Sequence, residues 1–215
     1  MKRLDVKWET PKLNLYDNIN PDDFLSALPA DYKNSGKPLV VYMATDAQEV
    51  SKKSSDVEQA VLREETFALG ARLFRTVRLK GDKFGKENPH WVTIGGKELP
   101  RVIVVDTNGQ KIGMLEGNDL TASNLFKQMR KAAAKTYKTD LEKVVKESRS
   151  LLDEMDQIEA KQKLLAEQKK KNAKPAKEQD LAAEEQKLAQ QMKDVQAREA
   201  DLLKKVDGER KVTKA

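Results

Sequence analysis

The stretch KPLVVYMATDAQEVSKK, from Lys37 to Lys53, decides the fold of this chain. Residues 39–44 form a short apolar run behind Pro38, as expected for a central strand that is covered on both faces of its sheet. The run then turns polar, and Thr45 or Asp46 could cap a helix. We therefore expect a buried strand that leads directly into a helix.

The segments that follow predict the rest of a small α/β domain. Apolar residues recur at roughly helical intervals over 57–73, and a second strand is expected at about 74–79. After a glycine-rich, charged connection comes RVIVVDTNGQKIGMLEG, at 101–117, where residues 106–109 join two apolar runs as in a β-hairpin. A helix over 121–134 closes the domain. The predicted order is strand, helix, strand, long connection, β-hairpin, helix.

This order and its local details resemble the thioredoxin-like superfamily over roughly residues 37–135. Lys37 and Pro38 open the central strand, and Leu99 and Pro100 stand where that superfamily places a cis-proline before its third strand. The glycine-containing segment GMLEG ends the β-hairpin before the last helix. The resemblance implies a three-layer α/β fold.

The resemblance also implies a binding edge. In the superfamily, the backbone beside the cis-proline receives extended peptides, and the corresponding residues here are Leu99, Pro100 and Arg101. His90 is the only histidine, so we expect no metal site built on a histidine pair. We expect His90 to pack in the connection near this edge.

The redox motif of the superfamily falls on residues without a thiol. It begins at Asp46 or Ala47, and the positions concerned are Asp46, Ala47, Gln48, Glu49 and Val50. The chain contains no cysteine, which excludes disulfide exchange because that reaction needs a thiolate at the helix N-terminus. We expect no catalytic residue and no cofactor.

A hydroxyl residue offers one alternative, a glutathione-handling enzyme of the same superfamily. Thr45 and Tyr42 are the candidates, with Ser51 nearby. We favour structural roles for them: Thr45 as a helix cap, Tyr42 as a core aromatic and Ser51 as a solvated helix residue. No second group is placed by spacing to assist proton transfer.

Residues 1–36 predict an arm laid over the domain, with one short helix. The segment NPDDFLSAL places Asn20 as the cap and Pro21 at the first helical position. Phe24 and Leu25 would then face the core.

The last third of the chain has a different composition. All eleven aromatic residues precede residue 138, and beyond it apolar residues recur every three or four positions, as in a coiled coil. The predicted seam consists of Leu141, Val145, Leu152, Met155, Leu165, Leu181, Leu188, Met192, Val195 and Leu202.

A break interrupts this pattern and predicts an antiparallel coiled-coil hairpin over 137–208, with its turn at about 171–176. Pro175 is unfavourable inside a helix but suits the first turn of a new one. The alternative is a single helix kinked at Pro175. Residues 209–215 are expected to be a disordered tail.

Lysines gather at the predicted turn. They are Lys169, Lys170, Lys171, Lys174 and Lys177. Such a cluster could contact phosphates of a nucleic acid, an anionic lipid surface or an acidic partner. With no aromatic residue nearby for base stacking, we favour a solvated turn.

The charge balance does not single out a partner. The net charge of +6 divides into +4 before residue 137 and +2 after it, so neither part is strongly cationic. No signal peptide is expected at the N-terminus. The compartment stays open: the cytoplasm is slightly favoured, and export is expected if a signal was removed.

The sequence therefore predicts an α/β, thioredoxin-like three-layer domain at 37–136 with a C-terminal antiparallel coiled-coil hairpin. Its expected function is non-enzymatic: a redox-inactive domain binds a protein partner, and the coiled coil serves self-association or docking. The glutathione-handling enzyme and the nucleic-acid-associated protein are the alternatives.

Overall fold

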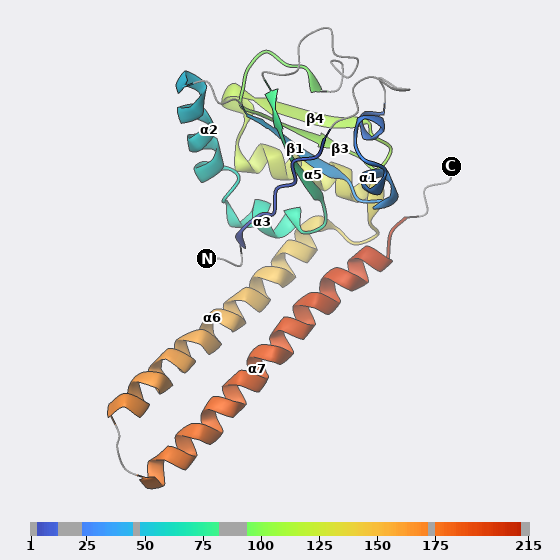
Figure 1. Cartoon of the computed structure of the whole chain (residues 1–215). Helices are drawn as coiled ribbons and strands as arrows, with labels where there is room; N and C mark the ends of the chain where they lie inside the picture. Colours follow the sequence, from blue (N-terminus) through green and yellow to red (C-terminus); the bar gives the residue numbers. More distant parts are fainter. Residues whose placement is uncertain (1–3, 13–22, 45–47, 82–93, 172–174, 212–215) are drawn as a thin grey trace. The chain divides into compact units, whose positions relative to one another are not determined.

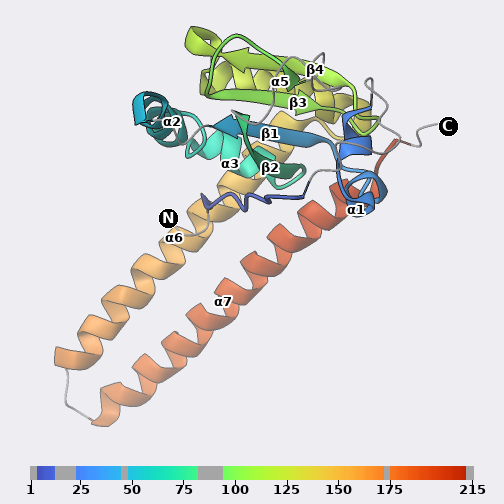
Figure 2. The same cartoon turned by 45° about the horizontal axis from the view of Figure 1, so that its top comes forward.

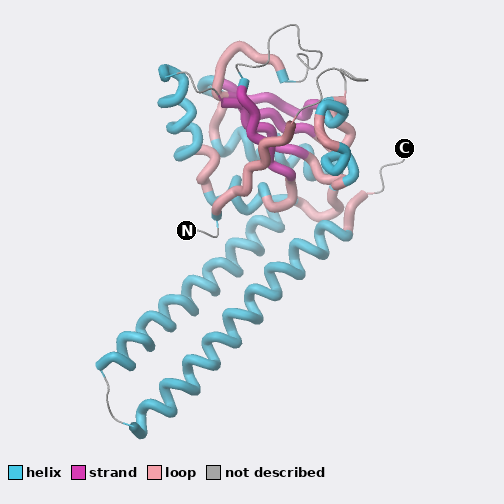
Figure 3. The backbone as a smooth tube through the Cα atoms, viewed as in Figure 1, coloured by secondary structure: helices cyan, strands magenta, loops and turns pink. Residues whose placement is uncertain are grey.

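The structure is a computed structural model, and it describes residues 4–12, 23–44, 48–81, 94–171 and 175–211. The chain forms two compact units. We call residues 1–142 with 209–215 the head, and residues 143–208 the helical hairpin (Figure 1). All described strands lie in the head (Figure 3).

The head contains a mixed sheet of four strands in the order β2-β1-β3-β4 (Figure 2). The strands are β1 (Leu39–Ala44), β2 (Arg75–Lys80), β3 (Arg101–Val105) and β4 (Lys111–Glu116). β1 pairs parallel with β2 and antiparallel with β3, and β3 pairs antiparallel with β4. Every residue of β1 is buried, as the uninterrupted apolar run predicts.

The register places core residues of neighbouring strands side by side in the sheet. Val41 lies opposite Val77 on one side and Ile103 on the other. Because side chains alternate across a strand, these three point to the same face of the sheet. There they join residues of the 3₁₀ helix η2 (Phe24–Ala27) and of helix α1 (Ala30–Asn34) in one core cluster.

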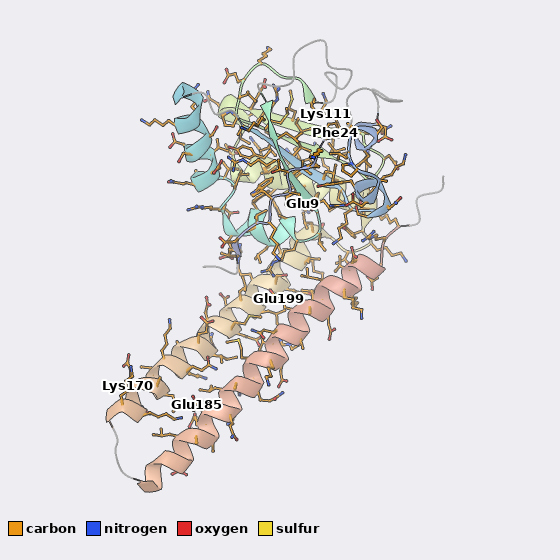
Figure 4. All side chains as sticks on the ribbon, viewed as in Figure 1. Glu9, Phe24, Lys111, Lys170, Glu185 and Glu199 are labelled. Carbon is orange, nitrogen blue, oxygen red and sulfur yellow. The ribbon has the colours of Figure 1, made fainter. Side chains whose placement is uncertain are left out.

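The segment before β1 is therefore part of the core and not only a surface arm. Phe24, labelled in Figure 4, is fully buried. η2 begins after Asp23, whose Oδ1 accepts the N–H of Leu25 at 2.9 Å. The predicted cap Asn20 and Pro21 lie outside the described residues.

Two helices connect β1 to β2, where the sequence pattern predicts one. α2 spans Gln48–Ala60 and α3 spans Glu65–Ala71. The second helix starts afresh because the Glu64 side chain caps it, accepting the N–H of Phe67 at 3.0 Å. The apolar spacing continues across the break, so periodicity alone did not reveal it.

The β-hairpin forms at the predicted turn. Gly109 has φ +81°, a conformation that glycine adopts without steric cost. Asp106 is buried, and its Oδ1 accepts the N–H groups of Asn108 and Gln110, each at 3.0 Å. After the short η4 (Gly117–Asp119), helix α5 (Ala122–Thr136) begins at its cap Thr121 and contacts β3 and β4.

The head ends later than the sequence predicts. Tyr137 is buried, and its hydroxyl donates to the Leu73 carbonyl at 2.5 Å. Leu141, predicted in the coiled-coil seam, also belongs to the head, and its side chain lies beside Gly70. The predicted boundary at residue 136 is therefore too early.

The segment after the helical hairpin corrects a second prediction. Arg210 forms an antiparallel bridge with Tyr137, and the N–H of Lys211 donates to the Thr136 carbonyl at 2.8 Å. Residues 209–211 thus pair with the head and are not part of a disordered tail. Residues 212–215 lie outside the described part of the chain.

The helical hairpin consists of α6 (Leu141–Lys171), apart from its first two residues, and of α7 (Pro175–Gly208). Pro175 occupies the first helical position as predicted. Arg198 pairs with Glu154 through two contacts, at 2.7 and 3.2 Å, and Lys169 pairs with Glu185. From the first pair to the second, the residue number rises on α6, from 154 to 169, and falls on α7, from 198 to 185. The two helices therefore run antiparallel. This arrangement differs from one kinked helix.

Burial along the two helices follows the apolar stripe. On α6 the predicted residues Leu141, Val145, Leu152, Met155 and Leu165 are buried. On α7, Leu188 and Val195 are buried, while Leu181, Met192 and Leu202 are half-buried. Leu164, which lies off the predicted seam, is 60% exposed.

No helix in the described part of the chain is long and apolar enough to cross a membrane.

Candidate functional site: a groove beside Pro100

A groove of about 250 Å³ opens beside the cis peptide bond between Leu99 and Pro100. Three segments of the head line it: the α2 residues Lys53, Asp56 and Val57, the loop residues Glu98, Leu99 and Pro100, and Gly117, Asn118 and Leu120 after β4. The lining combines apolar side chains with charges of both signs, a mixture that suits a polypeptide better than a purely apolar ligand.

Glu116 holds the loop that enters the groove. Its carboxylate accepts the N–H of Lys97 at 3.0 Å and that of Glu98 at 3.2 Å. Leu99 is positioned from the other side by Gly81, where an added Cβ would come within 2.4 Å of the Leu99 side chain. The hydrogen bonds from two backbone N–H groups to Glu116, together with the close contact between Gly81 and Leu99, therefore fix the loop.

Arg101 does not belong to the groove. Its side chain is only 3% exposed, and burial lowers the pKa of its guanidinium despite the nearby Glu116 carboxylate. Of the three residues predicted at the peptide-binding edge, Leu99 and Pro100 line the groove, whereas Arg101 is buried at the start of β3.

Three of the five positions that the resemblance assigns to a redox motif lie at the start of α2. Gln48, Glu49 and Val50 form its first turn, although their side chains are not described; Asp46 and Ala47 lie outside the described residues. No position in the chain carries a thiol, so thiolate chemistry is absent whatever the exact frame.

Tyr42 is poorly suited to activate a glutathione thiol. Its side chain is fully buried, and its hydroxyl lies 3.2 Å from Glu58 Oε1 and 3.4 Å from the Ser54 carbonyl oxygen. Burial raises the pKa of Tyr42 to about 12. Thr45 lies outside the described residues.

Sequence reasoning missed most of the groove lining. Lys53, Asp56 and Val57 have the spacing i, i+3 and i+4, which places them on one face of a helix. That spacing was available in the sequence, but nothing there showed that this face turns toward Pro100. Asn118 and Leu120 depend in the same way on how β4 meets the loop.

No group of three His, Cys, Asp or Glu residues that could hold a metal ion occurs among the described residues. His90 lies outside them.

The predicted lysine cluster is described only in part. Lys169 forms an ion pair with Glu185, and Lys170 is exposed (Figure 4). The side chains of Lys171 and Lys177 are not described, and Lys174 lies outside the described residues. One of the five lysines is thus already paired with a carboxylate of the same chain.

A solution structure of a thioredoxin from Thermus thermophilus is similar to this chain, with 14% sequence identity and a TM-score of 0.38, over 49% of this chain and 81% of that chain. No protein-family model matches the chain, and no curated protein sequence matches it.

Proposed function

We propose that this chain is a non-enzymatic binding module. Its head is a thioredoxin-like domain that holds an extended segment of a protein partner in the groove beside Pro100. The observation that carries the proposal is a groove at the edge where a thioredoxin-like domain receives peptides, in a chain with no cysteine. Without a thiolate, such a groove retains recognition and loses disulfide exchange.

The lining of the groove supports this role. The half-buried Val57 and Leu99 supply apolar surface, while Lys53, Asp56 and Glu98 supply charges that select a complementary segment. Electrostatic complementarity of this kind contributes more to specificity than to raw affinity. The buried hydroxyl of Tyr42 disfavours the glutathione-handling alternative.

The helical hairpin, in the same proposal, is a coiled coil that docks on a partner or on a second copy. Its two antiparallel helices each bury one stripe, and several positions on the α7 stripe are only half-buried. A two-helix assembly with so little buried surface gains from further packing.

Site-specific photo-cross-linking tests the groove. A photoreactive residue in place of Val57, on the full chain in an extract of its source cells, is expected to give a discrete adduct. Excess wild-type chain should compete for that adduct, whereas excess chain carrying Lys53→Glu and Asp56→Lys, both at exposed positions of the groove lining, should not.

The matched control carries the photoreactive residue at Lys127, an exposed position on α5 that does not line the groove. Two outcomes contradict the proposed function. One is an adduct of equal yield from Val57 and Lys127, and the other is equal competition by the wild-type chain and by the chain with the two groove substitutions.

A further inference from the structure

The N-terminal segment Lys7–Glu9 lies along the outer edge of β2 as a very short parallel strand. The N–H of Glu9 donates to the Thr76 carbonyl and the N–H of Arg78 donates to the Glu9 carbonyl, both at 2.8 Å. Thr76 Oγ1 also donates to the Lys7 carbonyl at 2.5 Å. Figure 2 shows the segment beside β2. This is the geometry of a peptide added to a sheet edge.

The ladder stops after one bridge for a covalent reason. In a parallel pair the next residue to bond would be residue 11. Pro11 has no N–H to donate. The segment is therefore held through its backbone over three residues only.

The side chain of Trp8 provides an aromatic anchor. The centroid of its ring lies 6.2 Å from that of the Phe67 ring, at an interplanar angle of 17°. The centroid of the Tyr42 ring lies 5.7 Å away, at an interplanar angle of 52°. Aromatic pairs at this geometry add stabilisation beyond the burial of their area. Trp8 itself is only half-buried.

The carboxylate of Glu9 is held by a preformed receptor. Both Nε and Nη2 of Arg75 donate to it, and the Tyr32 hydroxyl donates to it at 2.7 Å. Arg75 is oriented independently of the segment, because it stacks 3.5 Å from the centre of the Tyr32 ring and pairs with Asp31 at 2.7 Å. The Arg75 hydrogen bonds and then that of Tyr32 lower the pKa of Glu9.

The packing next to the segment is incomplete. A half-open pocket of about 440 Å³ lies between residues 4–9 and the α3 side of the head, where Ala68, Ala71 and Arg72 line it. Elements that pack closely in a core leave few such spaces between them. The segment is thus tied at Trp8 and Glu9 and is loosely packed beside them.

We propose that the β2 edge is a recognition site for an extended peptide in which an aromatic residue is followed directly by an acidic one. Residues 7–9 of the chain occupy this site in cis and keep it closed, and a matching segment of a partner protein opens it by replacing them. The site lies apart from the groove at Pro100 and does not depend on it, since no residue of the Lys7–Glu9 segment lines that groove.

The tethered segment lowers the apparent affinity of the site for a free peptide. An intramolecular occupant acts at an effective concentration of about millimolar for a short connection. A free peptide of the same sequence must compete with it, so weakening the tethered copy raises the apparent affinity for the free one.

Binding of a fluorescein-labelled peptide of residues 4–12, LDVKWETPK, to full-length variants tests this proposal by fluorescence anisotropy. The receptor carrying Trp8→Ala and Glu9→Gln is expected to bind the peptide at least about tenfold more tightly than the wild-type chain. A peptide carrying the same two substitutions should not bind. Adding Arg75→Gln to the opened receptor should abolish binding.

The matched control receptor carries Lys7→Ala and Thr10→Ala, which leave both anchoring side chains in place, and it should bind as weakly as the wild type. A folded opened receptor that binds no better than the wild type overturns the proposal. Loss of cooperative unfolding in that receptor also overturns it, because residues 7–9 would then be an integral strand. A wild-type dimer that becomes a monomer in the opened variant assigns the segment to a second copy and equally overturns closure in cis.

Discussion

The head and the helical hairpin bury their apolar side chains in different ways. In the head, β1 is covered on both faces, and every one of its six residues is buried. On α7, the buried positions among the described side chains are Leu188, Val195 and Val206, and most of the rest is exposed. The same chain thus contains a core that is closed on all sides and a pair of helices that share one narrow stripe.

Because of this difference, substitutions at the surface affect the stability of the two units in different ways. In the head, the fold is secured by its core, so the groove at Pro100 and the edge of β2 can vary without loss of the fold. In the helical hairpin, the burial that defines the structure leaves much of each helix surface polar and accessible. Stability there rests on few residues, and local opening is expected to cost less than global unfolding.

The largest expected effect is in the head. Phe67→Ala removes a fully buried ring that also stacks with Trp8, and it should lower the free energy of unfolding by about 3–5 kcal/mol. Urea denaturation measures this. Phe126→Ala, at a half-buried position of α5, is the control and should cost clearly less; an equal cost would contradict the distinction.

A core substitution in the helical hairpin should cost less. Leu188→Ala removes a buried side chain, and we expect a loss of about 2 kcal/mol, at the low end for such a change. Hydrogen exchange should show faster exchange on α6 and α7 with protection of β1 unchanged. Leu164→Ala, at the 60% exposed position, should have almost no effect. Equal loss of protection in β1 would show that the two units unfold together.

The β-hairpin turn in the head comes next. Asp106→Ala removes the acceptor of two backbone N–H groups and the partner of Lys135, whose Nζ lies 3.0 Å from Asp106 Oδ2. The expected loss is about 1–3 kcal/mol, because the N–H groups are left unsatisfied. Asp106→Asn keeps one acceptor oxygen and should cost less in thermal unfolding. If the two variants were equally unstable, the charge and not the acceptor would dominate.

The ion pair at the N-terminal segment should depend on pH. Because Arg75 and Tyr32 lower the pKa of Glu9, the pair stabilises the folded state above the ordinary carboxyl pKa of about 4.3, and the contribution is lost as pH falls through the lowered value. Glu9 is 40% exposed, so the contribution stays below about 1 kcal/mol.

Unfolding of the wild type and of Glu9→Gln between pH 7 and pH 3 measures this. The difference in stability should be full at pH 7 and shrink toward pH 3. Asp5→Asn, at an exposed position nearby, is the control. A difference that grew on acidification would contradict the assigned pKa direction.

The smallest effect is expected for the ion pair in the helical hairpin. Arg198→Ala removes the two contacts to Glu154. Arg198 is 58% exposed, and exposed pairs of this kind contribute little and are screened by salt. The thermal midpoint should not change resolvably, and any difference at low salt should vanish in molar salt. A salt-independent loss would show that Arg198 acts by packing.

Local signals explain how much of the fold was predictable. The run at residues 39–44 and the turn at Asp106 to Gly109 each act through neighbours within a few positions, and both occur as predicted. The helix predicted over 121–134 forms as α5 at 122–136, and Thr121 caps it. The break between α2 and α3 escaped prediction because the Glu64 cap is hidden within continuous apolar spacing.

The candidate site was predictable only in part. Leu99 and Pro100 were found from their place before β3, whereas Lys53 and Asn118 join them through contacts between distant segments. The contacts of Trp8 with Tyr42 and Phe67 and of Glu9 with β2 were not foreseen, since the partners lie far apart in the chain; Glu9 and Arg75, for example, are separated by 66 residues.

By itself, the sequence determined where the four strands form, where the β-hairpin turns, and that no thiol chemistry is available. These properties follow from side-chain spacing, backbone preferences and composition, which act locally. Tertiary structure alone decided that the head extends to residue 142 and that residues 209–211 pair with it. It also decided which face of α2 lines the groove at Pro100 and which side chains form hydrogen bonds to the Glu9 carboxylate. These outcomes depend on register and packing between remote segments, which no short stretch of sequence encodes.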